Sequence, residues 1–80
     1  MSSPVRSPEY QAFLKRLRAA RERAKLTQSE VARRLGKPQS YISKCESGER
    51  RVDAVELVAF ATIYGVSVEE ILLSRGRGRP

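Results

Sequence analysis

Apolar side chains recur every three or four positions along most of the chain, a spacing that places them on one face of an α-helix. No stretch shows the strict alternation of apolar and polar residues that indicates a strand. The expected helices span residues 8–24, 28–35, 38–47, 54–64 and 68–73. The pattern therefore predicts an all-α bundle of five short helices.

Local signals mark the ends of these helices. Thr27, Asp53 and Ser67 are each followed three residues later by a glutamate, which is the pattern of a capping box. Ser7 precedes a proline, and this pair favours the first turn of a helix. Gly36 follows the second helix and can adopt the left-handed backbone with which many helices end.

The helix expected at residues 38–47 has an unusual balance of side chains. Only Ile42 and Cys45 are suited to a core, whereas a helix in water normally needs a full apolar stripe. Its other side chains are mostly polar: Gln39, Ser40, Tyr41, Ser43, Lys44 and Glu46. We expect this helix to touch the core along one edge and to present its outer face to a partner.

Charge is distributed unevenly along the 80 residues, whose formal net charge is +7. Residues 52–73 carry four acidic and no basic side chains, while the rest of the chain is basic. One positive face is expected, and such a face suits a polyanion. The alternative is a charged surface that only keeps a small domain soluble.

Composition also excludes several classes of function. With no His and one Cys, the chain has no ligand set for a tetrahedral metal site and no His-based catalysis. No apolar run approaches the ~18 residues of a membrane span, and no signal peptide is visible. We expect a cytoplasmic binding protein that is not an enzyme, with no cofactor, no membrane segment and no evident small-molecule ligand.

Ala32, Gly36 and Ile42 have the spacing of two helices that cross steeply through a short turn. The small side chain permits close crossing, the glycine permits the turn, and the isoleucine anchors the next helix. This arrangement is the helix-turn-helix, whose second helix fits the major groove of DNA.

In that arrangement, side chains near the start of the second helix reach base edges. Gln39 can pair with adenine and Lys44 can donate to guanine. Ser40 and Ser43 share the face of Gln39. The alternative is that these side chains form a solvated helix surface.

The chain resembles the lambda-repressor-like, Cro-type helix-turn-helix family, also called the XRE family, in the segment TQSEVARRLGKPQSYISKCESGER at residues 27–50. The resemblance covers about residues 10–73 and includes GVSVEEIL at residues 65–72. It implies a five-helix lambda-repressor-like bundle that binds double-stranded operator DNA. It also implies a homodimer on a near-palindromic site.

The same resemblance implies the residues that contact DNA. Gln39, Ser40 and Lys44 match base-contacting positions, and Gln28 matches a residue that touches phosphate and steadies Gln39. Side chains beside them and in the following loop match positions near phosphate or thymine methyl groups. The full expected set is Gln28, Gln39, Ser40, Tyr41, Ser43, Lys44, Arg50 and Arg51.

Other side chains of this region have more than one interpretation. Arg21 and Glu46 match a family pair that docks the recognition helix, and we expect this pair to be structural and partly buried. Tyr41 either contacts DNA or simply covers the edge of its helix. Cys45 is interpreted as a small buried hydrophobe, with a redox-sensing thiol as the alternative.

The fourth and fifth helices are more apolar than one buried face requires. Large contiguous apolar surfaces are rare on small monomers. We therefore expect the fifth helix and the end of the fourth to form a two-fold homodimer interface. Half-sites on DNA would then lie about one turn, or ~34 Å, apart.

The ends of the chain have a different composition from the domain. We expect a flexible segment at residues 1–7, the DNA-binding domain at residues 8–73 and a flexible basic tail at residues 74–80. The tail ends in RGRP, which resembles the core of an AT-hook that binds the minor groove. We interpret the tail as a disordered segment that adds nonspecific attraction to phosphate, with the AT-hook as the alternative.

Three functions fit these patterns. The first is a sequence-specific transcriptional regulator, most simply a repressor or autoregulator, as in phage, restriction-modification or toxin–antitoxin systems. The second is a protein-interaction module of the same fold, such as an antitoxin or adaptor, with weak DNA binding. The third is a nonspecific nucleic-acid binder that acts through its basic face.

Overall fold

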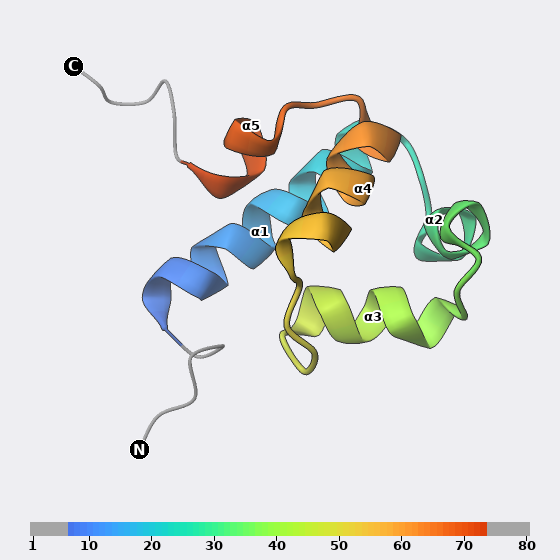
Figure 1. Cartoon of the computed structure of the whole chain (residues 1–80), viewed down its shortest axis with the longest axis horizontal. Coiled ribbons are helices and arrows are strands. Elements are labelled where there is room, and N and C mark those ends of the chain that lie inside the picture. The colour runs from blue at the N-terminus through green and yellow to red at the C-terminus, as the bar shows by residue number, and fades with distance from the viewer. Residues whose placement is uncertain (1–6, 74–80) are drawn as a thin grey trace.

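Five α-helices make up most of the computed structural model, which describes residues 7–73 (Figure 1). The predictions for residues 1–6 and for the tail at 74–80, with its AT-hook-like end, lie outside the described residues. No strand occurs between residues 7 and 73, so the all-α prediction is confirmed. The helices are α1 (Pro8–Arg23), α2 (Gln28–Leu35), α3 (Gln39–Ser47), α4 (Ala54–Tyr64) and α5 (Val68–Leu72).

The predicted capping boxes set the starts of three helices. At α2, the Thr27 hydroxyl accepts a hydrogen bond from the backbone N–H of Glu30 at 3.1 Å, and the Glu30 carboxylate accepts one from the N–H of Thr27 at 2.8 Å. Asp53 with Glu56, and Ser67 with Glu70, make the same exchange. Each exchange satisfies backbone donors that have no partner within the helix.

Small differences from the predicted boundaries have local causes. Pro38 is the N-cap of α3 and not its first helical residue, because its backbone is extended (ψ 156°) while its carbonyl accepts the N–H of Tyr41 at 3.0 Å. Ala24 caps the end of α1, and Leu73 caps the end of α5. Gly36 ends α2 in the left-handed conformation, as predicted (φ 69°).

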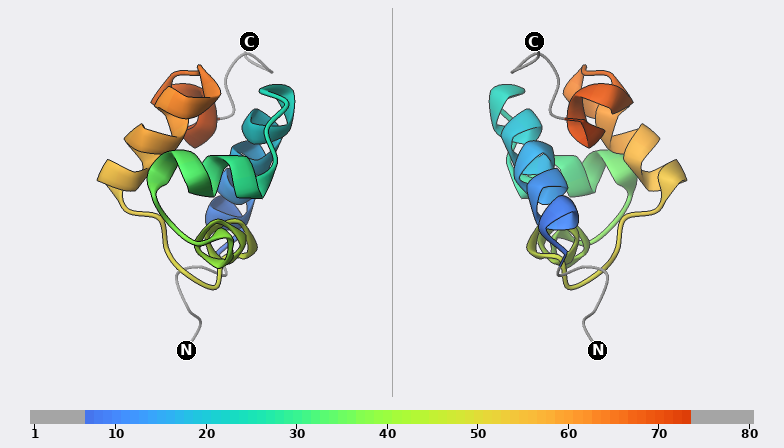
Figure 2. Two further views of the ribbon diagram at one scale, coloured as in Figure 1. Left: turned by 90° about the vertical axis from the view of Figure 1, so that its right-hand side faces the viewer. Right: turned by 90° about the vertical axis from the view of Figure 1, so that its left-hand side faces the viewer.

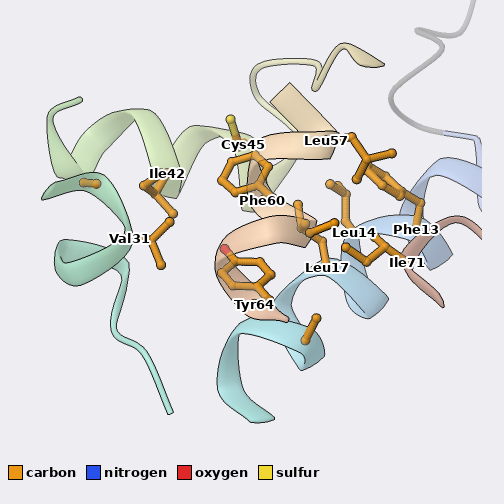
Figure 3. Close-up of a cluster of buried hydrophobic side chains, with 13 residues drawn as sticks. Phe13, Leu14, Leu17, Val31, Ile42, Cys45, Leu57, Phe60, Tyr64 and Ile71 are labelled. Atoms are coloured by element: carbon orange, nitrogen blue, oxygen red, sulfur yellow. The ribbon is translucent and has the colours of Figure 1, made fainter. Parts of the chain in front are cut away.

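Every helix contributes to one hydrophobic core (Figure 3). Every helix supplies at least one of the largest fully buried side chains, which are Leu17, Val31, Ile42, Cys45, Phe60 and Ile71. Val31 and Ile42 face one another where α2 meets α3. The apolar faces predicted from periodicity are therefore the faces that the fold buries.

Arg16 supplies a contact that the helical pattern does not predict. Its guanidinium donates to the backbone carbonyls of Ile71 and Leu72, each at 2.7 Å. A cation at the C-terminus of a helix satisfies free carbonyls and is favoured by the helix dipole. A side chain of α1 thus secures the short α5, which has only five residues.

α3 lies along one edge of the domain, on the side away from α5 (Figures 1 and 2). Its inner edge meets α2 and α1, and its outer face has no helix over it among the described residues. The fold therefore presents the polar outer face of α3 at the surface.

Two valines in helices differ sharply in burial, and their substitution tests which residues form the core. Val31 is 0% exposed and Val55 is 79% exposed, although both lie in helices. Val31→Ala should lower the free energy of unfolding by about 1.5–3 kcal/mol, because it removes buried methyl groups and leaves a cavity. Val55→Ala should change it by less than about 0.5 kcal/mol. Urea denaturation followed by circular dichroism measures both; equal effects would contradict the assigned core.

Candidate nucleic-acid interface

The outer face of α3 carries the side chains that the sequence assigns to base contacts. Gln39, Ser40, Ser43 and Lys44 are all exposed. The inner edge of the helix is formed by its buried residues Ile42, Cys45 and Glu46. The helix is thus divided lengthwise into a buried edge and a free polar row.

A buried ion pair holds the inner edge of α3 to α1. Arg21 donates from Nε to Glu46 Oε2 at 2.6 Å and from Nη2 to Glu46 Oε1 at 3.1 Å. The two side chains are only 12% and 2% exposed. Arg21 also donates from Nη1 to the carbonyl of Leu26 at 2.9 Å, and its hydrogen bond to Glu46 raises the pKa of the guanidinium. The pairing predicted from the family resemblance is confirmed.

Hydrogen bonds continue from this ion pair to the exposed face. Gln28 donates from Nε2 to Glu46 Oε1 at 2.9 Å, and Gln39 donates from Nε2 to Gln28 Oε1 at 2.6 Å. The predicted contact of Gln28 with Gln39 is therefore present. An amide nitrogen has two N–H donors, so Gln39 keeps a donor and an acceptor for a bidentate contact with adenine.

Tyr41 connects α3 to α4. Its hydroxyl donates to Glu56 Oε2 at 2.8 Å, and its half-buried ring has Arg50 and Lys37 over it, 4.8 and 5.2 Å from the centroid. Burial raises the pKa of the Tyr41 phenol. Tyr41 thus does more than cover a helix edge, because its ring binds Lys37 from the segment before α3 and Arg50 from the segment after it.

Arg50 forms a second ion pair, in the loop after α3. Its Nη2 lies 2.7 Å from Glu56 Oε2, and its Nη1 donates to Glu56 Oε1 at 3.0 Å. The Arg50 side chain is still 42% exposed. Donation from Arg50 lowers the pKa of Glu56 to about 2. Next to it, Arg51 lies over the ring of Tyr10, 4.9 Å from the centroid.

No sequence pattern placed Glu56 in this region. Its place in the capping box indicated only a local role at the start of α4. The six-residue separation from Arg50 falls across a loop and a helix start, where side-chain spacing has no fixed geometry. The only sequence signal was a glutamate close to a basic loop.

Cys45 is fully buried, with 0% exposure. Burial raises the pKa of its thiol, although Arg50 Nη1 lies 3.9 Å from the sulfur. A thiol that is buried and protonated is a poor nucleophile. The interpretation of Cys45 as a small buried hydrophobe is confirmed.

The structure therefore brings the predicted residues to one side of the domain. Gln28 and Gln39 share a hydrogen bond, and Ser40, Ser43 and Lys44 follow on the same helix. Tyr41 and Arg50 contact one another, whereas Arg51 contacts α1 instead.

In the described part of the chain, no helix is both long and apolar enough to cross a bilayer.

Comparison with known proteins agrees with this geometry. Residues 12–73 match a family described as a helix-turn-helix domain. Among solved structures, the chain is similar to an XRE-family like protein from Pseudomonas syringae pv. tomato str. DC3000, with 45% sequence identity and a TM-score of 0.75. That match covers 80% of this chain and 78% of the other. No curated protein matches the chain.

Removing one partner of the buried ion pair tests its role. Glu46→Ala should lower the free energy of unfolding by about 3–5 kcal/mol, because Arg21 would remain buried without its counter-charge. The control is Glu49→Ala, at an exposed position in the following loop, which should cost less than about 0.5 kcal/mol. Urea titration monitored at 222 nm gives both values. A small cost at Glu46 would show that α3 docks without this pair.

Proposed function

The chain belongs to the helix-turn-helix proteins of the XRE type, and from this membership we propose that it is a sequence-specific DNA-binding transcriptional regulator. It acts as a repressor or autoregulator at a near-palindromic operator. α3 enters the major groove, and the segments around it contact the phosphate backbone.

One observation carries the proposal: α3 is held by buried groups along one edge while its outer row stays exposed. Ile42 and Glu46 fix the helix from within, so the exposed side chains need not contribute to the core. A rigid helix with a free polar row can approach base edges without losing much conformational entropy. Gln39, Ser40 and Lys44 are the side chains we assign to bases.

Cations placed around α3 support a phosphate-binding role. Lys37 precedes the helix and Arg50 follows it, and both lie over the ring of Tyr41. Arg33 and Arg34 are exposed on α2. The acidic segment at residues 52–73 contains α4 and α5. Of these two helices, α5 lies on the side of the domain away from α3. We assign phosphate contacts to Gln28, Ser43, Tyr41, Arg50 and Arg51.

Exposed apolar side chains support a homodimer. Within residues 7–73, the large apolar side chains that stay exposed are Val55 and Val58 on α4, and Leu72 and Leu73 at the end of α5. The two valines lie on the first half of α4, whereas the end of that helix was expected from the sequence. Near the end of α4 the exposed position carries Thr62, which is polar, and Ile63 is half-buried. The proposed two-fold interface therefore includes α5 and the start of α4.

One of these apolar side chains, Leu72, supports a second candidate function. Leu72 lines an open groove together with Phe13 and Leu57, and such a groove can accept a segment of another protein. In this alternative the domain is an interaction module, such as an antitoxin or adaptor, with weak or nonspecific DNA binding. The two functions differ in their preference for one DNA sequence.

In vitro selection of bound DNA, followed by binding assays with variants, tests the DNA-binding proposal. A true operator should be preferred over scrambled DNA by about a thousandfold or more. Gln39→Ala or Lys44→Ala should weaken operator binding by about 1–3 kcal/mol and relax the preference at one base. The control is Arg23→Ala, an exposed residue in the last turn of α1, which should leave that preference unchanged. If both α3 variants kept the wild-type preference for the operator over scrambled DNA, the assignment of base contacts to α3 would be wrong.

Analytical ultracentrifugation tests the homodimer. The wild type should be dimeric at tens of micromolar, and Val58→Glu should shift it to monomer because a buried, unpaired charge is costly at an interface. Ser29→Glu adds the same charge at an exposed position of α2 and should leave the dimer intact. A wild type that stays monomeric at high micromolar concentration would refute the two-fold interface.

A further inference from the structure

We propose that Glu56 is a positioning residue for DNA recognition, which holds Arg50 and Tyr41 in place and offsets part of the charge with which Arg50 attracts any DNA. This inference rests on the proposed function of the domain. It assigns a role in specificity to a side chain of α4, a helix that does not itself approach the exposed row of α3.

One carboxylate makes contacts to three separate segments. Oε2 of Glu56 accepts from the Tyr41 hydroxyl at 2.8 Å and lies 2.7 Å from Arg50 Nη2. Oε1 accepts from Arg50 Nη1 at 3.0 Å and from the backbone N–H of Asp53 at 2.9 Å. Glu56 therefore joins α3, the loop after it and the start of α4 through a single group.

The other capping-box glutamates show that these contacts exceed what a cap requires. Glu30 and Glu70 occupy the same position in α2 and α5, and each accepts from the backbone N–H of its own N-cap residue. Of these three glutamates within residues 7–73, Glu56 alone has a hydrogen-bonded arginine. The capping box explains its contact with Asp53 but leaves its contacts with Arg50 and Tyr41 unexplained.

The position of Tyr41 links Glu56 to the DNA-facing surface. Tyr41 follows the exposed Ser40 in α3, and its half-buried ring has Arg50 and Lys37 over it. A hydroxyl held by Glu56 restricts the rotation of the tyrosine side chain. The two cations that flank α3 are thereby placed before DNA arrives, which reduces the conformational entropy lost on binding.

The charge of Glu56 has a second effect. A carboxylate 2.7 Å from a guanidinium cancels much of its long-range field, so Arg50 attracts phosphate less strongly than a free arginine would. Free positive charge in any geometry raises the affinity for nonspecific DNA. Affinity for the specific site rises when the cations are held in the correct geometry. Glu56 is thus expected to raise the ratio of specific to nonspecific affinity.

Glu56→Gln tests this inference with little risk to the fold. Glutamine also serves in a capping box: its amide oxygen can keep the hydrogen bond from the Asp53 N–H, and its NH2 group can donate to the Tyr41 oxygen, so mainly the ion pair with Arg50 is lost. At ~0.1 M salt, affinity for scrambled DNA should rise about five- to tenfold, and the slope of log affinity against log salt should steepen by about 0.9 per chain. Preference for the selected operator should fall by at least the same factor.

Two matched controls separate this role from capping and from bulk charge. Glu70→Gln makes the same change in the capping box of α5 and should leave both operator preference and salt slope unchanged. Glu49→Gln removes an exposed carboxylate adjacent to Arg50 and should not lower operator preference. For scrambled DNA, the double variant Arg50→Gln/Glu56→Gln should bring the salt slope back toward the wild-type value, because the pair carries no net charge.

Nuclear magnetic resonance of the free protein reports whether the Arg50 side chain is held in place. The guanidinium Nη signals of Arg50 should show slow rotation in the wild type and in Glu70→Gln, but fast rotation in Glu56→Gln. If Glu56→Gln matches Glu70→Gln in salt slope and operator preference, the inference is wrong while the proposed function stands. If the wild type binds operator and scrambled DNA equally, the proposed function fails and the role of Glu56 in recognition fails with it.

Discussion

The buried ion pair between Arg21 and Glu46 sets the orientation of α3, because that helix has too few apolar residues to dock by burial alone. Glu46 is 2% exposed, and a charge in such a place is tolerated only when its oxygens are satisfied. Both oxygens accept from Arg21, and one also accepts from Gln28. These donors have fixed directions, so they specify one placement of α3, whereas hydrophobic contact does not depend on direction.

Two carboxylates organise the recognition surface from opposite sides. Glu46 acts from within, through Gln28 to Gln39, and positions a side chain assigned to bases. Glu56 acts from α4, through Tyr41 and Arg50, and positions groups assigned to phosphate. In both cases a carboxylate lies beneath the surface that we propose binds DNA, which is a polyanion. Such a charge weakens general attraction to DNA but holds donors in place, which favours selectivity over bulk affinity.

Sequence patterns were sufficient for much of the fold and for part of the candidate site. The helix ends follow from capping boxes and from glycine, since these signals act over three or four residues. The exposed row of α3 follows from its shortage of apolar residues around Ile42. The Arg21–Glu46 pair was expected only through the family resemblance, because nothing in a separation of 25 residues indicates contact. The contacts of Arg16 with α5 and of Glu56 with Arg50 were not foreseen.

The sequence by itself determined which segments become helices, approximately where they begin and end, and which face of α1, α2 and α3 is buried, because periodicity and capping are local properties of the chain. Only the tertiary structure decided which charged side chains meet, since the partners of Arg16, Arg21 and Arg50 depend on the path of the turns and on how the helices cross. Tertiary packing also decided that Leu57, Phe60 and Tyr64 of α4 face the core while Val55 and Val58 stay exposed. A helix that is apolar on all sides does not specify by periodicity which side will face the core.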